Sequence, residues 1–404
     1  MKSWTVMTYL AGDNNLDPNG TEDLMEMKRV GTNANINVVA QFDSESDAHK
    51  TKRYLLTKNS NLAGDVVETL GNVNTGDPKN LVDFAHWAIS TYPAERYLLV
   101  LWNHGQGWDD TDIFAGERGR GARLPRSRKI AHALFKTSVV TVAKVAADGG
   151  GNVARAILID DDAKDFLDNL EMKNVLKAVH TKLGHKLDLL GMDACLMSMP
   201  EVGYQMRDYV AFTVGSEETE PLEGWPYEEI LRQLAKTPNM TADALGKTVV
   251  KKYLASYKGS GEAVTQSLCD LSQSPGLANA VKALATSLKA ALGNPAARAA
   301  IRDARDQVQT YEVPDNVDLA DLCTLIKSGV VPQAVKTACD GVLAAHGSFV
   351  ASSGYLGAPM RYSKGAAIYF PTVSISPLYA RLDFVKNTGW GRFLKAYLAA
   401  IRSR

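Results

Sequence analysis

Long apolar runs and an excess of one charge are both missing from this 404-residue chain. No run of about 18 apolar residues occurs, so no membrane-spanning helix is expected. Lys and Arg together number 45, and so do Asp and Glu, so no global field favours a nucleic acid or an acidic membrane as partner. Internal repeats and low-complexity tracts are also lacking. The function must therefore be sought in local features.

Cysteine is scarce as well, with four residues in the whole chain, at positions 195, 269, 323 and 339. They form no CxxC pair and are too sparse for a disulfide scaffold or a Cys-rich zinc site. We expect Cys269, Cys323 and Cys339 to be small buried hydrophobic residues. Only Cys195 lies in a sequence context that suggests chemistry.

The chain has no leader-like segment before its first strand-like run, residues 4–10. A charged region, an apolar core and a cleavage site would be expected in an attached signal peptide. We therefore expect no signal peptide here, which leaves open either a cytoplasmic protein or the mature form of a secreted one.

Strand-like and helix-like segments alternate over the first 220 residues, as in an α/β protein with a mostly parallel central sheet. The expected strands are 4–10, 36–42, 97–102, 156–159, 187–192 and 210–214, with helices at 79–92, 171–183 and 195–207. After about residue 225 the expected helices are 239–257, 275–311, 318–329, 332–346 and 377–402. We expect a core over 1–235 and a helix-rich C-terminal region, 236–404, that contributes strands 264–270 and 366–371 to the core.

Two of the apolar runs end in residues able to do covalent chemistry. The run 97–102 leads into His104 and Gly105, and the run 187–192 leads into Asp193 and Cys195. Nearly continuous apolar runs are typical of strands buried on both faces of a parallel sheet. Ligands of such sheets bind at the carboxyl ends of the strands. His104 and Cys195 are therefore a candidate base and nucleophile, although about 90 residues separate them.

The surroundings of Cys195 suit a reactive thiolate. We expect a helix to begin at this residue, and its N-terminal amides would lower the pKa of the thiol. His104 could protonate a leaving amine, and the backbone N–H groups of Gly105 and Cys195 could form an oxyanion hole. A structural cysteine and a hydrogen-bonded histidine in a turn are the alternative interpretation.

Acidic residues follow nearly every expected strand. They are Asp13, Asp43, Asp160, Asp161, Asp162, Asp193, Glu217 and Glu218. Asp is also a common turn and helix N-cap residue, which explains any one position taken alone. Together the positions favour a cationic ligand, either a basic side chain or a divalent metal.

The segment 109–155 interrupts this alternation, because it is polar, rich in Gly and then basic. A loop of this length within a compact domain is usually functional or disordered. A solvated surface insertion is the alternative. A nucleic-acid site is disfavoured, because aromatic residues are not interleaved with the basic ones.

Several motifs make the chain resemble the clostripain family of cysteine peptidases, in the clan of caspases, legumain and gingipains. They are Tyr9-Leu10-Ala11-Gly12-Asp13-Asn14-Asn15-Leu16, Leu101-Trp102-Asn103-His104-Gly105-Gln106-Gly107-Trp108, Met192-Asp193-Ala194-Cys195-Leu196-Met197, Gly215-Ser216-Glu217-Glu218 through Gly224-Trp225-Pro226-Tyr227, and Ile368-Tyr369-Phe370-Pro371. They occur in the family's order and span most of the chain.

The resemblance implies a caspase-like three-layer α/β/α sandwich with a His104/Cys195 dyad. It implies an endopeptidase that cleaves proteins or peptides after Arg or Lys, with Asp193 at the base of the S1 pocket. We expect Glu217, Glu218 and Trp225 to bind substrate as well. A non-catalytic module that binds basic peptides or metal is the alternative from another class, and a hydrolase or transferase acting on small molecules is a third.

The resemblance also implies a zymogen that is cut between the His and the Cys. The candidate bonds follow Arg126, Arg128, Lys129, Lys136, Lys144 and Arg155, so we expect a monomer or a self-cleaved two-chain form. Some members of the family depend on calcium, for which Asp160 to Asp162 with Glu217 and Glu218 could supply oxygen ligands. They do not form an EF-hand pattern, and no other cofactor is expected.

Overall fold

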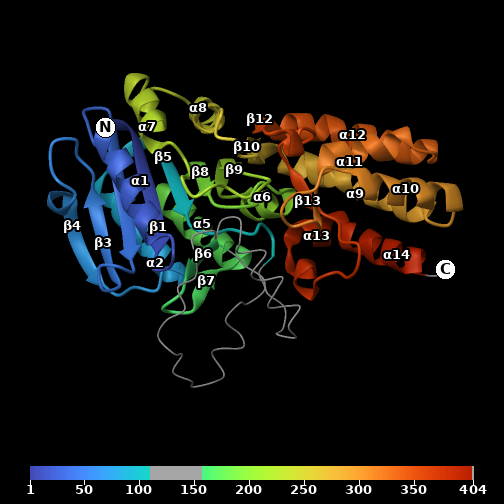
Figure 1. The fold of residues 1–404 in the computed structure, drawn as a ribbon, viewed down its shortest axis with the longest axis horizontal. Helices are drawn as coiled ribbons and strands as arrows, with labels where there is room; N and C mark the ends of the chain where they lie inside the picture. The colour runs from blue at the N-terminus through green and yellow to red at the C-terminus, as the bar shows by residue number, and fades with distance from the viewer. Residues whose placement is uncertain (110–156, 403–404) are drawn as a thin grey trace, which may run out of the picture.

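A large sheet with helices on both faces dominates the computed structural model, which describes residues 1–109 and 157–402 (Figure 1). A mainly helical region, which contains the C-terminus, extends from one end of this sheet. All the candidate cleavage positions, from Arg126 to Arg155, lie outside the described residues.

The central sheet has nine strands and is parallel at its centre. They are β1 (Lys2–Gly12), β2 (Ile36–Ser44), β3 (Lys50–Leu55), β4 (Val66–Gly71), β5 (Ala94–Trp102), β8 (Leu187–Asp193), β9 (Val210–Gly215), β10 (Val264–Asp270) and β12 (Val350–Leu356). Their order is β12-β10-β9-β8-β5-β1-β2-β3-β4. Among these described strands only β3 and β10 run against the others. The expected mostly parallel sheet is thus confirmed.

The three strands at the centre of the sheet are buried on both faces, as their apolar runs predict. Leu98, Leu99 and Val100 of β5 are at most 2% exposed, and Leu189 and Leu190 of β8 are fully buried. Polar backbone groups buried to this degree must pair within the sheet, and both edges of β5 do so, with β1 and β8. The sheet therefore holds the ends of β1, β5 and β8 in a fixed relation.

Helices cover the two faces of the sheet in separate layers. One layer contains α1 (Asp17–Val30), α7 (Tyr227–Lys236) and α8 (Ala242–Ser256), and the other contains α2 (Pro78–Thr91), α5 (Asn169–Leu183) and α6 (Pro200–Met206). This arrangement is the three-layer α/β/α sandwich.

The C-terminal region packs helices against α6 and against the end of the sheet. Its elements are α9 (Ser274–Ala291), α10 (Pro295–Gln307), β11 (Asn316–Asp318), α11 (Leu319–Ser328), α12 (Gln333–Phe349), β13 (Ala367–Tyr369), α13 (Asp383–Thr388) and α14 (Trp390–Arg402). Short 3₁₀ turns are η1 (Ala63–Asp65), η2 (Leu271–Gln273), η3 (Ala358–Met360) and η4 (Pro377–Arg381). No helix of the described residues is long and apolar enough to span a bilayer.

Several expected elements differ from those observed. The run 156–159 forms β6 (Ile157–Asp160), which pairs with β7 (Asp165–Leu167) in a two-stranded sheet instead of joining the central one. The run 366–371 likewise forms β13, which pairs with β11, and only 264–270 enters the large sheet as β10. The expected helix 275–311 is two helices, because Asn294 caps a new one that starts at Pro295.

The sequence patterns did not reveal β3, β4, β12 or α1. The two strands β3 and β4 lie at the edge of the sheet. β3 is mostly polar, and β4 is short and largely exposed, so neither forms a buried apolar run. The helix α1 is polar, with an N-terminal Asp-Pro that suits a turn as well as a first helical turn.

Candidate active site

His104 and Cys195 follow neighbouring strands that pair in register. β5 and β8 run parallel, and the last pair of their ladder joins Trp102 to Asp193. His104 and Cys195 each stand two residues beyond that pair. Because paired strands lie about 4.8 Å apart, this register brings both residues to the same edge of the sheet. Both are largely buried there, at 8% and 5% exposure.

The imidazole of His104 contacts a side chain from a third strand end. Its Nε2 atom lies 3.1 Å from Oδ1 of Asn15, in the loop after β1, which is the other neighbour of β5. An amide oxygen can only accept a hydrogen bond, so Nε2 carries the proton and the basic lone pair of the neutral ring is on Nδ1. Asn15 belongs to the first motif, yet nothing in its sequence context indicated this contact.

Two buried asparagines hold the backbone on which His104 stands. The side-chain amide of Asn14 donates to the carbonyl of Ile159 at 2.9 Å, and that of Asn103 donates to the same carbonyl at 3.1 Å. Both amides also donate to the carbonyl of Ala11. The ends of β1, β5 and β6 are thereby joined, so the turn that carries His104 is tied to its neighbours.

The expectation that a helix over 195–207 begins at Cys195 is wrong. The helix α6 begins at Pro200, and residues 195–199 form a loop in which Leu196 has φ = +65°. Proline disfavours the helical conformation in the residue before it, so the helix cannot extend back to the cysteine. A positive φ at a leucine is a strained conformation that concentrates at functional sites. No helix N-terminus therefore acts on the thiol.

The thiol instead accepts a hydrogen bond from a backbone N–H group of another loop. The N–H of Glu220 donates to Sγ of Cys195 at 3.3 Å, and the N–H of Leu196 donates to the carbonyl of Glu218 at 3.2 Å. The loop 216–220, which follows β9, thus lies along the turn that bears Cys195. A hydrogen bond donated to sulfur favours the thiolate over the thiol.

Gly105 lies directly against the backbone of Cys195. A Cβ atom placed on Gly105 would be 2.6 Å from the carbonyl oxygen of Cys195 and 3.2 Å from its nitrogen. No side chain fits at this distance, so the position requires glycine for a close approach. The two N–H groups that were expected to form an oxyanion hole therefore belong to adjoining backbone segments.

Asp193 is enclosed by residues of the loop that leads into α7. Its carboxylate accepts hydrogen bonds from the hydroxyl of Tyr227 at 2.7 Å and from the N–H of Trp225 at 3.3 Å. The ring of Trp225 covers Gly191, where a Cβ atom would be 2.8 Å from it. The carboxyl group of Glu220 lies close enough to that of Asp193 for each to shift the other's pKa, and it accepts from the side-chain amide of Gln266 at 3.1 Å.

These acids carry raised pKa values because they are buried. Burial raises the pKa of Asp193 to about 6. Burial and then the charge of Asp193 raise the pKa of Glu220 well above its usual range, and the same two causes act on Asp23. Asp23 accepts from the indole N–H of Trp102 at 2.7 Å. A cationic side chain would relieve this accumulation of negative charge.

Glu217 and Glu218 are not brought to Asp193. The carboxylate of Glu217 accepts from the hydroxyl of Tyr311 at 2.7 Å, and burial and the charge of Asp318 raise its pKa. That of Glu218 accepts from the backbone N–H of Glu312 at 3.1 Å. Both side chains therefore fix the loop to the C-terminal region, and their neighbour Glu220 faces Asp193. Glu217, Glu218 and Glu220 lie within four positions, and the sequence alone did not indicate which of their side chains would face Asp193.

Other acidic strand ends form a separate cluster. Asp13 lies 2.7 Å from Nδ1 of His49, and one donor atom of each of Asp13, His49 and Asp162 lies within 4.8 Å of the others. Asp43 is fully buried beside them, and burial raises its pKa to about 8. Asp160 accepts instead from backbone N–H groups of its own turn and of the loop before α2.

The calcium ligand set expected from Asp160 to Asp162 with Glu217 and Glu218 is not assembled. The side chains of Glu217 and Glu218 bind Tyr311 and the backbone of Glu312, whereas Asp162 lies with Asp13 beyond the end of β1. Glu217 and Glu218 follow β9, whereas Asp160 to Asp162 follow β6 and lie near the end of β1, which is on the other side of β5, so one ion cannot contact both groups.

Comparison with known proteins points to one family. The family model of peptidase C11, the clostripain family, matches residues 8–121 and 144–394. Clostripain from Hathewaya histolytica is 27% identical over 226 residues, which cover 50% of this chain and 36% of that protein. The match therefore spans only about a third of the length of this relative.

Solved structures show the same fold. A secreted C11 cysteine protease from Bacteroides thetaiotaomicron, in complex with an irreversible peptide inhibitor, has a TM-score of 0.66 at 20% identity, over 96% of this chain and 100% of that one. An inactive zymogen C11 protease from Parabacteroides distasonis has a TM-score of 0.66 at 19% identity, over 96% and 99%. The expected caspase-like sandwich is confirmed by this likeness.

The contact between Asn15 and His104 predicts an effect on the thiol. In Asn15→Ala the imidazole loses its acceptor, so we expect alkylation of Cys195 by iodoacetamide near pH 7 to slow by about tenfold. Asn15→Asp keeps an acceptor oxygen and should restore most of the rate. Site-resolved mass spectrometry across a pH series measures this. An unchanged pH profile in Asn15→Ala, matching that of the distant control Asn387→Ala, would show that the contact does not act on the dyad.

Proposed function

Because the chain belongs to the clostripain family, peptidase family C11, we propose that it is a cysteine endopeptidase cleaving after Arg or Lys. The observation that carries the proposal is the β5–β8 ladder, which sets His104 beside Cys195 and places Asp193 at the strand end two residues before the cysteine. A nucleophile, a base and a buried carboxylate then converge on one edge of the sheet. Clostripain itself is the curated relative that matches half of this chain.

In the proposed reaction the thiolate of Cys195 attacks the carbonyl carbon of the scissile bond. The C–N bond breaks, and the leaving nitrogen takes a proton from the imidazolium of His104. Water then hydrolyses the thioester, giving its proton to His104 and its hydroxyl to the acyl carbon. The N–H groups of Gly105 and Cys195 are assigned to the oxyanion in both steps.

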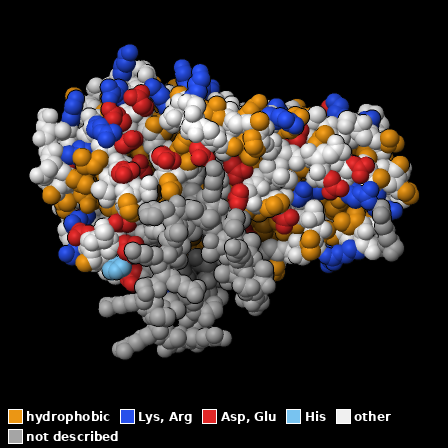
Figure 2. Space-filling view, viewed as in Figure 1, with side chains coloured by type: hydrophobic (Ala, Val, Ile, Leu, Met, Phe, Trp, Pro, Cys, Tyr) orange, Lys and Arg blue, Asp and Glu red, His pale blue; other side chains and the backbone are white. Residues whose placement is uncertain are grey.

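The proposed S1 pocket is selective for a positive charge. Asp193 and Glu220 are 3% and 1% exposed, and burial and the charge of Asp193 raise the pKa of Glu220 well above its usual range, which favours a proton on Glu220. A guanidinium or ammonium group would pair with both carboxylates and release that proton. Asp and Glu side chains also form a band across the middle of the face in Figure 2. This band would attract basic segments of a protein substrate.

Activation by self-cleavage in the loop after His104 is part of the proposal. The candidate bonds follow Arg126, Arg128, Lys129, Lys144 and Arg155, all outside the described residues. An enzyme directed to Arg or Lys would find several targets there, and one related structure is that of an inactive zymogen. The product would be a two-chain form of the monomer.

Calcium dependence remains a prediction, based on the resemblance alone. Within residues 1–109 and 157–402, the group of donor atoms available to a cation is that of Asp13, His49 and Asp162, with a nitrogen and carboxylate oxygens. This set suits a transition metal better than calcium, which prefers oxygen ligands throughout. Assays with EDTA and with added calcium belong in every activity measurement.

Loss of the nucleophile should abolish activity and processing together. In Cys195→Ala we expect hydrolysis of a fluorogenic Arg-terminated peptide to fall at least about 10³-fold, with a single uncut chain by intact mass. Cys339→Ala, which alters a cysteine buried far along the chain, should behave as the wild type. Self-processing at the wild-type rate in Cys195→Ala would exclude the dyad. If the wild-type chain stayed uncut and did not hydrolyse the peptide, with and without calcium, the result would favour the non-catalytic module that binds basic peptides or metal.

Neutral substitutions in the pocket should remove the preference for a cation. For Asp193→Asn we expect kcat/KM for Arg and Lys substrates to fall by about 10²-fold or more, and for Glu220→Gln by about tenfold. A substrate with Leu at the cleaved position should change little. Glu218→Gln is the matched control, because its carboxylate binds backbone. Equal losses for all three variants would contradict the assignment.

The same variants have a predicted pH signature. The raised pKa of Asp193 means that the folded protein holds this proton up to about pH 6, whereas the unfolded chain releases it near pH 4. As the pH rises from about 4 to about 6 the free energy of unfolding therefore falls, with no further loss above pH 6, and Asp193→Asn should be at least as stable as the wild type at pH 7. In the wild type, KM for Arg substrates should rise as the pH falls below 6. Urea unfolding and KM measured from pH 4 to 8 test both.

Gly105→Ala should impair catalysis without loss of substrate binding. The added methyl group meets the backbone of Cys195, so Gly105 must move and its N–H leaves the oxyanion position. We expect kcat to fall by about 10²-fold with little change in KM. A variant with full kcat would show that this N–H does not stabilise the oxyanion.

A further inference from the structure

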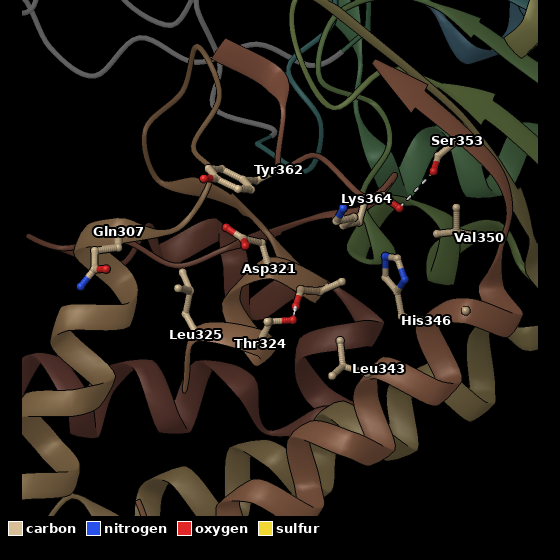
Figure 3. A pocket seen from close by; sticks show the side chains of 12 residues that line it. Gln307, Asp321, Thr324, Leu325, Leu343, His346, Val350, Ser353, Tyr362 and Lys364 are labelled. Atoms are coloured by element: carbon tan, nitrogen blue, oxygen red, sulfur yellow. Dashed lines mark hydrogen bonds between the residues drawn. The ribbon is translucent and has the colours of Figure 1, made fainter. Parts of the chain in front are cut away.

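A hollow outside the candidate active site lies in the C-terminal region, between α11, α12 and the segment after β12. It has a volume of about 760 Å³, which is within the range of small-molecule sites. Figure 3 shows Asp321 rising from α11 and His346 rising from α12, with Lys364 between them in this view. None of these residues belongs to the proposed peptidase site, so the hollow needs its own explanation.

Two opposite charges face this hollow without neutralising each other. Among residues 1–109 and 157–402 the Lys364 ammonium forms no ion pair, and its charge acts on Asp321 only from a distance. One oxygen of the Asp321 carboxylate accepts from the N–H of Gln309 at 2.9 Å. The other oxygen has no hydrogen bond within the described chain. A ligand could therefore meet a cation and an anion in the same hollow.

His346 provides an independent observation. It is 6% exposed, its Nε2 atom has no hydrogen-bond partner, and its ring lines the hollow. An unsatisfied buried polar atom is costly, and a polar ligand group would relieve the cost. Burial also lowers the pKa of His346 to about 4, so the ring is neutral at pH 7 and can either donate or accept.

Apolar side chains form part of the remaining wall of the hollow, beside the polar residues Gln307, Thr324 and Ser353. Leu325, Leu343 and Val350 are partly buried hydrophobic residues that line it, and Tyr362 stands at its rim with 47% exposure. These side chains offer an apolar surface and an aromatic ring close to the two charges. The combination matches a ligand with an ammonium group, a carboxylate and an apolar side chain.

We propose that this hollow binds a short apolar peptide with free termini, its ammonium group at Asp321, its carboxylate at Lys364 and its side chains on Leu325 and Leu343. A free apolar amino acid has the same chemistry. We favour the peptide, because the volume of the hollow exceeds that of one amino acid and Lys364 acts on Asp321 only through its charge, without a direct ion pair between them in the described chain. The binding does not depend on the proposed peptidase function.

The probe is the dipeptide Leu-Leu, titrated calorimetrically into the full chain carrying Cys195→Ala so that no turnover occurs. We expect one site, with affinity at least tenfold weaker in Lys364→Met and in Asp321→Asn. The side chain of Lys364 is exposed and Asn keeps the shape of Asp, so both variants should fold. Lys336→Met, on α12 but outside the hollow, is the matched control and should bind as the parent does.

Blocked and smaller probes separate the contributions. Leu-Leu amide lacks the carboxylate, so its affinity should not respond to Lys364→Met, and N-acetyl-Leu-Leu should not respond to Asp321→Asn. Free leucine binding more tightly than Leu-Leu would identify an amino acid site and overturn the preference for a peptide. No binding of either probe at 5 mM (about the weakest Kd of interest), or affinities unaffected by both substitutions, would overturn the proposal.

Discussion

The parallel pairing of β5 with β8 is the constraint on which the rest of the site depends. The ladder ends with Trp102 opposite Asp193, and the two chains leave the sheet together from there. Parallel pairing cannot slip by one residue without moving every buried side chain to the other face. The burial of both strands therefore fixes where His104 and Cys195 stand, although each is held by a turn that is irregular in itself.

The C-terminal region completes the site through the loop 216–220. This loop donates the Glu220 N–H to Cys195 and turns the Glu220 carboxyl towards Asp193. It is anchored from the other side, where Glu217 meets Tyr311 and Asp318. The N–H groups of Asp321 and Lys364 both donate to Asp318, so the residues of the hollow and the anchor of the loop share one carboxylate.

The parts of this arrangement that the sequence predicted are those that depend on burial. Apolar runs revealed the strands on either side of the dyad, and their ends revealed His104 and Cys195. The local backbone conformation was harder to predict. The stretch before Pro200 is apolar, so its sequence suggested a helix where the structure has a loop. The choice among neighbouring acids depends on tertiary contacts, and so Glu220 was missed. Asn15 was missed for the same reason, because its partner lies 89 positions away.

The most direct test of this account is labelling with an arginyl chloromethyl ketone, followed by intact and peptide mass spectrometry. We expect one adduct per chain, located on Cys195, with the cysteines at 269, 323 and 339 unmodified, because the Arg group directs the reagent to Asp193, two residues before Cys195. His104→Ala should slow the labelling, and so should an excess of a competing Arg peptide. Labelling spread over several cysteines, or a rate independent of both His104 and the Arg group, would contradict it.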